Sequence, residues 1–204
     1  DRVFLVDETG KSVSGSTTTA LLASVFLREN PGATILYNLI CSRIVPETIT
    51  SLGGKAIRTK NGHSYMKQVM AQTGAVFAGE HSGHYYFADN YRADSGLIAT
   101  MVVLGEMCRT GKSLSELRKP FEKYANSGEI NMQVANIQEV IERITKKFAN
   151  YPQDHLDGLT VDCGTWWFNV RPSNTEPLLR LNLEAATREE CDEHVAELLM
   201  LITA

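Results

Sequence analysis

The segment with the densest set of reactive side chains is Gly79-Glu80-His81-Ser82-Gly83-His84. It offers a carboxylate, a hydroxyl and two imidazoles within five residues. In an extended loop, Glu80 and Ser82 alternate with His81 and point the same way, so they can hold two neighbouring hydroxyls of a sugar. The imidazole of His84 can move a proton near neutral pH. A polar turn with solvated histidines is the alternative interpretation.

A second polar segment, Arg171-Pro172-Ser173-Asn174-Thr175-Glu176-Pro177, lies between two expected strands. The guanidinium group of arginine is a planar fork that matches a phosphate group bidentately. Ser173, Asn174 and Thr175 add side-chain donors, and the converging N–H groups of a tight turn bind anions. We therefore expect a phosphate-binding loop, in which Arg171 is exposed and contributes little to stability. A plain turn rich in Ser, Asn and Pro is the alternative.

A third polar segment, Lys60-Asn61-Gly62-His63, connects an expected strand to an expected helix. Because the amide groups at a helix N-terminus attract anions, this segment is a further candidate for ligand contact. Two acidic residues, Asp89 and Asp94, bracket Tyr91-Arg92. We expect them to be loop and N-cap residues and not a catalytic carboxylate pair.

Alternating strands and helices surround these segments as far as about residue 125. The expected strands lie at Val3–Val6, Ala33–Ile40, Lys55–Thr59 and Ala75–Ala78. One expected helix begins among Ser16–Thr18, and the others lie at Val45–Leu52, His63–Thr73 and Ser95–Thr110. This alternation predicts a mixed, mostly parallel sheet in an α/β/α domain. Loops after the strands of such sheets hold ligands, which is where the first polar segment falls.

The pattern changes at Asn126-Ser127-Gly128, which we expect to be a linker. The order beyond it is strand, helix, three strands and helix, with strands expected at Ile130–Val134, Leu159–Cys163, Trp166–Val170 and Leu178–Leu183. This order predicts a small α+β domain with an antiparallel sheet backed by two helices. We therefore expect domains over residues 12–125 and 126–204, preceded by a connecting segment over residues 1–11.

The composition excludes several classes of partner. Among 204 residues, 20 Lys and Arg stand against 24 Asp and Glu, which argues against a nucleic-acid binder. No apolar run approaches the ~20 residues that span a membrane.

The cysteines form no C-x-x-C pair, so we expect reduced thiols in a cytoplasmic protein. We interpret the opening Asp1-Arg2, without Met, as the interior of a longer protein.

Together and in this order, the first two polar segments resemble the sugar-recognition and phosphate-binding loops of the α-D-phosphohexomutase superfamily. The wider stretches Arg58–Ser64 and His84–Gly96 look most like its bacterial phosphomannomutase/phosphoglucomutase branch. The resemblance covers essentially the whole chain, which looks like the third and fourth of four domains, the fourth being TBP-like. Residues 1–11 would then be the end of the preceding metal-loop domain and a connecting strand.

The resemblance implies an isomerase that interconverts hexose 6-phosphate and hexose 1-phosphate through a phosphoserine and a bisphosphate intermediate. Mannose phosphates are the expected substrates, with glucose or glucosamine phosphates as the alternative. The phosphoserine belongs to the missing N-terminal domains, so the 204 residues are expected to bind sugar and phosphate without catalysing alone. An alternative of another class is a non-catalytic phosphosugar-binding module.

The same resemblance implies roles for individual residues. The candidates for substrate binding are Glu80, Ser82, Lys60, Arg171, Ser173, Asn174 and Thr175. The candidates for catalysis are His84, His63 and Arg2. Asp1 would be one ligand of a Mg²⁺ ion whose site lies largely outside this chain. Two positions depart from the family pattern: Ile40 stands where many relatives have a basic residue, and His81 where Met or Gln is usual.

Overall fold

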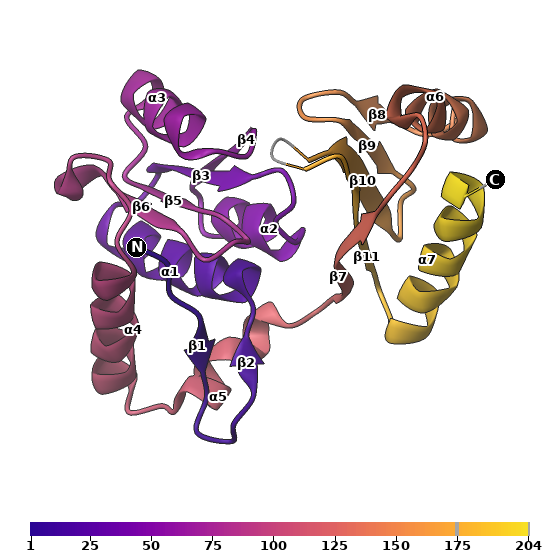
Figure 1. The fold of residues 1–204 in the computed structure, drawn as a ribbon. Helices are drawn as coiled ribbons and strands as arrows, with labels where there is room; N and C mark the ends of the chain where they lie inside the picture. The colour runs from indigo at the N-terminus through magenta and orange to yellow at the C-terminus, as the bar shows by residue number, and fades with distance from the viewer. Residues whose placement is uncertain (174–175, 204) are drawn as a thin grey trace. The chain divides into compact units, whose positions relative to one another are not determined.

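The computed structural model describes residues 1–173 and 176–203 and divides into two units, Asp1–Lys123 and Tyr124–Ala204 (Figure 1). Each unit has its own sheet and its own helices. Among the residues described, no helix is long and apolar enough to cross a membrane.

The sheet of the first unit has four strands in the order β4-β3-β5-β6. Its strands are β3 (Thr34–Asn38), β4 (Lys55–Thr59), β5 (Phe77–Gly79) and β6 (Tyr85–Phe87). The first three run parallel, and β6 pairs antiparallel with β5. Ile35 and Leu36 point to opposite faces of β3 and are both fully buried, as in a central parallel strand. The predicted mixed, mostly parallel sheet is confirmed.

Helices lie on both faces of this sheet. The helical elements of the first unit are α1 (Gly15–Glu29), α2 (Ile44–Ser51), α3 (His63–Thr73), η1 (Ala88–Asn90), α4 (Gly96–Thr110), α5 (Leu114–Arg118) and η2 (Lys119–Phe121). On one face, Phe26 of α1 stacks on Phe77 of β5 with 5.0 Å between ring centroids. On the other face, Met66 and Met70 of α3 pack against Ala78. Because Phe77 and Ala78 are neighbours in one strand, α1 and α3 lie on opposite sides, which makes three layers.

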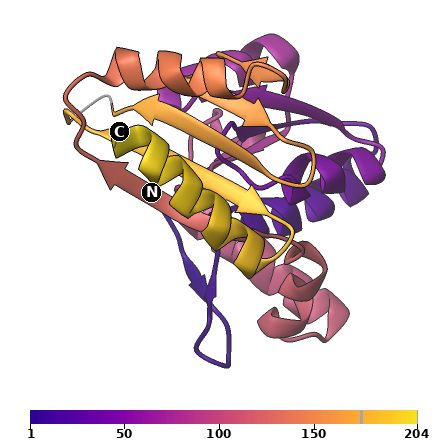
Figure 2. The ribbon, with the colours of Figure 1, turned by 90° about the vertical axis from the view of Figure 1, so that its right-hand side faces the viewer.

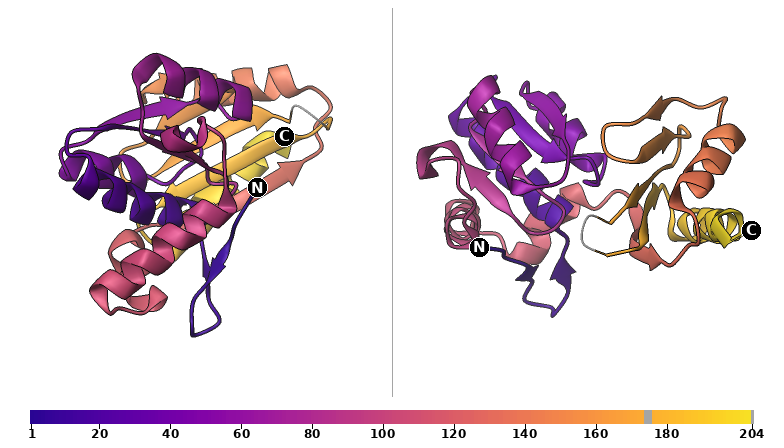
Figure 3. Two further views of the ribbon diagram at one scale, coloured as in Figure 1. Left: turned by 90° about the vertical axis from the view of Figure 1, so that its left-hand side faces the viewer. Right: turned by 45° about the horizontal axis from the view of Figure 1, so that its top comes forward.

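A short hairpin of β1 (Leu5–Val6) and β2 (Ser12–Val13) projects from the first unit (Figure 3). Asp7 holds its turn, because one carboxylate oxygen accepts hydrogen bonds from the backbone N–H groups of Thr9 (2.9 Å) and Lys11 (3.0 Å). The other oxygen lies 2.7 Å from the guanidinium of Arg118, which ties the hairpin to α5.

The second unit has one antiparallel sheet in the order β7-β11-β10-β9-β8. Its elements are β7 (Ala125–Met132), α6 (Ile137–Lys147), β8 (Gln153–Asp154), β9 (Leu159–Asp162), β10 (Trp167–Pro172), β11 (Leu179–Ala185) and α7 (Arg188–Thr203). Ile144 of α6 and Leu198 of α7 share one apolar core with Phe168 and Leu181. Both helices therefore back the same face, as Figure 2 shows and as the sequence predicted.

The prediction of a linker at Asn126-Ser127-Gly128 is wrong, because these residues belong to β7. Asn126 pairs with Glu184, and the register shifts between Asn182 and Glu184, which marks a β-bulge. Ser127 Oγ accepts a hydrogen bond from the Leu183 N–H at 2.9 Å. Asn126, Ser127 and Gly128 therefore form an irregular part of a strand, although their composition is typical of a linker.

Candidate functional site

The segment Gly79–His84 is a tight turn between β5 and β6, not the extended loop expected. The Glu80 N–H donates to the His84 carbonyl at 2.9 Å, and the Gly83 N–H donates to the Glu80 carbonyl at 3.1 Å. Gly83 has φ +84°, and a Cβ there would lie 2.9 Å from the ring of Phe4. The turn therefore requires glycine at this position.

Glu80 lies buried beneath this turn with 3% of its surface exposed. Its Oε2 accepts a hydrogen bond from the Tyr86 hydroxyl at 2.9 Å and lies 3.3 Å from Nδ1 of His84. Its Oε1 accepts from the Gly62 N–H at 3.3 Å, at the start of α3. The carboxylate is thus held by groups from three segments of the first unit.

His84 is also buried, and both of its ring nitrogens have partners. Nε2 accepts a hydrogen bond from the Arg2 Nε–H at 3.0 Å, so the neutral ring carries its proton on Nδ1. That nitrogen lies 3.0 Å from Ser82 Oγ. Burial lowers the pKa of His84, against the opposing effect of Glu80. The imidazole is therefore neutral near pH 7 and able to accept a proton.

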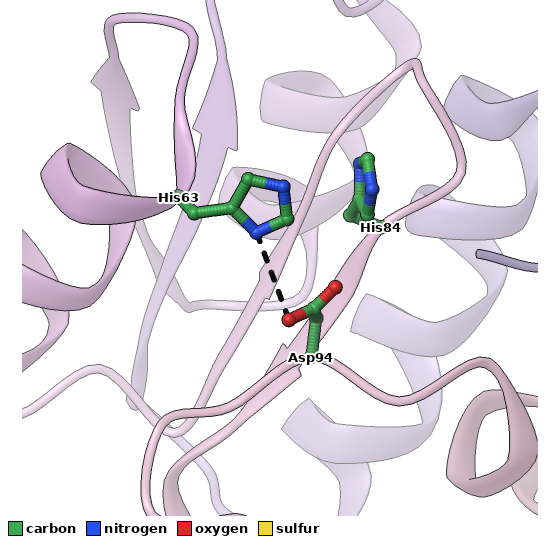
Figure 4. A group of neighbouring side chains, drawn as sticks. All are labelled: His63, His84 and Asp94. Atoms are coloured by element: carbon green, nitrogen blue, oxygen red, sulfur yellow. Dashed lines mark ion pairs between the residues drawn. The ribbon is translucent and has the colours of Figure 1, made fainter. Parts of the chain in front are cut away.

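His63 approaches the same place from the first position of α3 (Figure 4). Its ring centroid lies 4.5 Å from that of His84. Its Nδ1 lies 3.1 Å from the Tyr86 hydroxyl and 3.7 Å from Oδ1 of Asp94. Burial and the charge of Glu80 raise the pKa of Tyr86, so its hydroxyl keeps its proton.

The sequence analysis missed Tyr86 and Asp94 as members of this cluster. Asp94 is not the N-cap of α4, since the Ser95 side chain accepts the capping hydrogen bond from Ile98. An isolated β-bridge joins Tyr86 and Asp94 instead. This bridge helps to bring Asp94 to His63, and no local pattern in the sequence predicts it.

The turn is anchored on the side away from Glu80. The His81 N–H donates to Oδ1 of Asn38 at 3.0 Å, and its Nδ1 lies 2.9 Å from Ser16 Oγ. A Cβ at Gly15 would lie 2.2 Å from the His81 carbonyl oxygen, so the start of α1 packs directly on the turn. His81 therefore points toward α1, and Asn38, which the sequence analysis also missed, fixes the turn to β3.

The remaining candidates of the first unit lie at its surface. Arg2 reaches His84, whereas Oδ1 of Asp1 accepts a hydrogen bond from the Arg2 N–H at 2.7 Å. Lys60 is exposed, and its Nζ lies 5.4 Å from the ring centroid of Tyr65. The structure thus gathers Arg2, Glu80, Ser82, His63 and His84 around one point, and leaves Lys60 and Asp1 with contacts beside it.

Arg171 is a buried strand residue, so the expectation of an exposed loop arginine is wrong. It stands in β10 opposite Arg180 of β11 and is 5% exposed. Gly158 packs on it, since a Cβ at Gly158 would lie 2.6 Å from that of Arg171. Burial lowers the pKa of Arg171, while its ion pair with Glu129 at 2.8 Å acts in the opposite direction.

Among residues 1–173 and 176–203, the buried Nε of Arg171 has no hydrogen-bond partner. Ser173 follows at the strand end, where its N–H donates to the Leu178 carbonyl at 2.8 Å. Its Oγ accepts from the Glu176 N–H at 3.3 Å. Asn174 and Thr175, the other expected phosphate contacts, lie outside the described residues.

Comparison with known proteins assigns both units. The model of the phosphoglucomutase/phosphomannomutase alpha/beta/alpha domain III matches residues 14–124, and that of the C-terminal domain matches residues 129–200. The chain is 45% identical to a phosphomannomutase of Methanocaldococcus jannaschii over 202 residues, covering 99% of this chain and 45% of that protein. It is 38% identical to a phosphomannomutase of Escherichia coli over 188 residues, covering 91% of this chain and 41% of that protein.

A solved structure gives the same assignment. A phosphoglucomutase/phosphomannomutase family protein of Burkholderia thailandensis superposes with a TM-score of 0.83 at 28% identity, covering 97% of this chain and 44% of that one. The chain therefore spans less than half the length of these relatives. Residues 1–204 belong to the phosphoglucomutase/phosphomannomutase family, of which they form the third and the C-terminal domain.

Proposed function

We propose that this chain is the sugar- and phosphate-binding half of a phosphomannomutase, which interconverts mannose 6-phosphate and mannose 1-phosphate through a phosphoserine and a bisphosphate intermediate. The observation that carries the proposal is the network in which the buried side chains of Glu80, Tyr86 and His84 meet the exposed His63, with Arg2 on His84. The names of the relatives support mannose. A structural neighbour, an N-acetylphosphoglucosamine mutase of Aspergillus fumigatus, was solved in complex with glucose 1,6-bisphosphate.

Within this proposal, Glu80 and Ser82 bind sugar hydroxyls. Both side chains lie within 3.3 Å of Nδ1 of His84, so a hydroxyl that they hold is close to an imidazole. A hydroxyl that attacks phosphorus must lose a proton, and the nitrogen of the neutral His84 ring that can take it is Nε2, which faces Arg2. The Arg2 guanidinium, 3.0 Å from that ring, supplies positive charge where a phosphoryl group gathers negative charge.

The phosphate that does not react is assigned to Arg171, Ser173, Asn174 and Thr175. A buried donor without a partner costs about 1–3 kcal/mol. The Nε of Arg171 is such a donor among the described residues, and an anion at this position would satisfy it. The buried setting strengthens a charged hydrogen bond and supports this assignment.

We assign Mg²⁺ as the cofactor, and its magnesium site is largely outside these residues. Mg²⁺ requires several oxygen ligands in octahedral geometry, whereas Asp1 offers one exposed carboxylate that already accepts a hydrogen bond. Asp1 fits as one ligand of a site completed by the preceding domains. When bound, Mg²⁺ neutralises charge on a transferring phosphoryl group. A second Aspergillus fumigatus mutase structure contains GlcNAc-6P and magnesium.

The compartment that we assign is the cytoplasm. All four cysteines are free in the structure. Free thiols of this kind persist in reducing compartments, which supports the assignment.

Assays of the longer protein that contains this chain test the proposal. We expect turnover of mannose 6-phosphate that requires Mg²⁺, and no turnover by the 204 residues alone. A higher kcat/KM for glucose or glucosamine phosphates would change the substrate assignment. An upstream sequence without a phosphorylatable serine loop and further aspartates would favour the non-catalytic binding module.

A further inference from the structure

Three possible metal ligands meet in the first unit: His63, His84 and Asp94 (Figure 4). One ligand atom from each lies within 4.8 Å of the other two. The ligand atoms of a tetrahedral zinc site stand roughly 3.3 Å apart, given Zn–N distances of about 2.0–2.1 Å. The ligand atoms therefore have to move closer together by up to about 1.5 Å to hold one ion, and we expect side-chain rotation to bring them there.

Asp94 supplies a second, independent observation. Its side chain is 9% exposed, and its Oδ2 is buried with no hydrogen-bond partner among the described residues. In Figure 4 one carboxylate oxygen faces His63 and the other points toward His84. Buried carboxylate oxygens normally have a partner, so this oxygen is able to accept a cation. The side chain of His63 is 46% exposed, which gives an ion access from solvent.

The donor atoms decide which cation fits. Two imidazole nitrogens and one carboxylate oxygen suit Zn²⁺ and neighbouring transition metals, whereas Mg²⁺ and Ca²⁺ prefer oxygen ligands. Three protein ligands leave a fourth position open, as in zinc sites that accept water or substrate.

We propose that His63, His84 and Asp94, a ligand set without Asp1, form a binding site for Zn²⁺, and that Zn²⁺ bound there inhibits the enzyme. Nε2 of His84 carries the lone pair that a metal needs, and Arg2 now donates to it. Zn²⁺ and the Arg2 guanidinium therefore compete for His84. The inhibition rests on the proposed function, because the captured imidazole is the one assigned to proton transfer.

Calorimetric titration of the 204-residue chain with ZnCl₂ in a non-chelating buffer tests the site directly. We expect one ion per chain with a micromolar Kd. His63→Gln and Asp94→Asn should each weaken binding at least tenfold. His155→Gln is the matched control, because His155 is an exposed histidine of the second unit, and it should leave the Kd unchanged. MgCl₂ in excess should not compete.

Arg2→Met gives a sharper test, because it removes the competitor of the metal. It should tighten Zn²⁺ binding several-fold, whereas loss of a merely structural contact would leave the Kd unchanged. CoCl₂ should produce a visible absorption band in the parent chain that His63→Gln abolishes. The proposal is overturned if the parent chain does not bind Zn²⁺, or if His63→Gln and Asp94→Asn bind it with the parent affinity.

Failure of this inference can be told from failure of the proposed function. Zn²⁺ binding to the chain needs no catalytic activity, so it can hold in a protein that is not a mutase. In an active longer protein, ZnCl₂ added at constant Mg²⁺ should reduce turnover over the same concentration range as it binds. Full activity with the site saturated would overturn the inhibition and leave the mutase assignment standing.

Discussion

The hydroxyl of Tyr86 donates a hydrogen bond to Oε2 of Glu80 at 2.9 Å, and both side chains are buried. The same hydroxyl lies 3.1 Å from Nδ1 of His63. One tyrosine therefore links the carboxylate proposed to bind sugar with a histidine at the start of α3. The raised pKa of Tyr86 keeps the phenol protonated, so this link persists across the physiological pH range.

Glu80→Gln in the longer, active protein should lower kcat/KM about ten- to a hundredfold. The change keeps the size of the side chain and removes its charge, and hydrogen bonds to charged groups contribute about 1.5–3 kcal/mol. Tyr86→Phe keeps the carboxylate and should cost less, about three- to tenfold, since it removes one neutral donor. Steady-state kinetics measure both, with the exposed Glu189→Gln as the control. Parent kinetics in Glu80→Gln would remove Glu80 from the site.

Arg171→Ala should destabilise the second unit by about 1–3 kcal/mol. The substitution removes the partner of Glu129 and leaves a gap beneath Gly158. Urea unfolding of the 204-residue chain measures the loss, with the exposed Lys147→Ala on α6 as the control. Equal unfolding midpoints for the two variants would contradict the burial of this arginine.

Thiol labelling should separate the cysteines by burial. Burial raises the pKa of Cys41 to about 12, so its thiol has almost no reactive thiolate near neutral pH. Cys108 is exposed. We expect a maleimide to modify Cys108 in the native chain and Cys41 only after denaturation. Peptide mapping by mass spectrometry identifies the adducts, and early labelling of Cys41 would disprove its burial.

Local patterns in the sequence were enough to predict most of the helices and strands. The predicted strand Lys55–Thr59 and helix His63–Thr73 coincide with β4 and α3. The helix ends where Gly74 adopts a left-handed conformation with φ +68°, and glycine is the residue that most often predicts such a helix end. The order of strands and helices then left few possible folds.

Contacts between segments that are far apart in the chain could not be predicted from local patterns. The three residues of β6 become a strand only by pairing with β5. Asp94 reaches Tyr86 because Tyr91 and Arg92 reverse the chain with φ of 54° and 60°, which their residue types do not favour. The burial of Arg171 could not be predicted, because it stands where a strand pattern meets a segment rich in turn residues. The glycine that packs on it, Gly158, lies thirteen residues earlier in the chain.

Acid should destabilise the chain through Asp7. Hydrogen bonds from the Thr9 hydroxyl, from the Lys11 and Thr9 backbone and from Arg118 lower the pKa of Asp7 from 3.8 to about 2. Between these two values the unfolded chain binds more protons than the folded chain, so the free energy of unfolding falls as the pH drops. The stabilisation is complete above pH 3.8 and is lost toward pH 2.

Urea unfolding at several pH values measures this effect. Asp7→Asn should be less stable than the parent at pH 6, and the difference should shrink as the pH falls below about 4. Asp192→Asn, at an exposed position of α7, controls for the general effect of losing one negative charge. A parent-minus-variant difference that stays constant down to the acid limit would show that Asp7 is not the titrating group.

Inorganic phosphate should bind the second unit at Arg171, because the buried Nε offers an anion a donor that is unused among the described residues. We expect a millimolar Kd, equivalent to about −4 kcal/mol, since one small anion makes few contacts. Backbone amide shifts of the 204-residue chain during a phosphate titration should cluster at Arg171–Ser173. Arg171→Lys keeps the charge and loses the fork, so it should weaken binding about three- to tenfold. Sodium chloride at matched ionic strength separates binding from screening. Shifts that cluster on Gly79–His84 and spare Arg171 would reverse the assignment, with the turn of the first unit holding phosphate in place of the β10 strand.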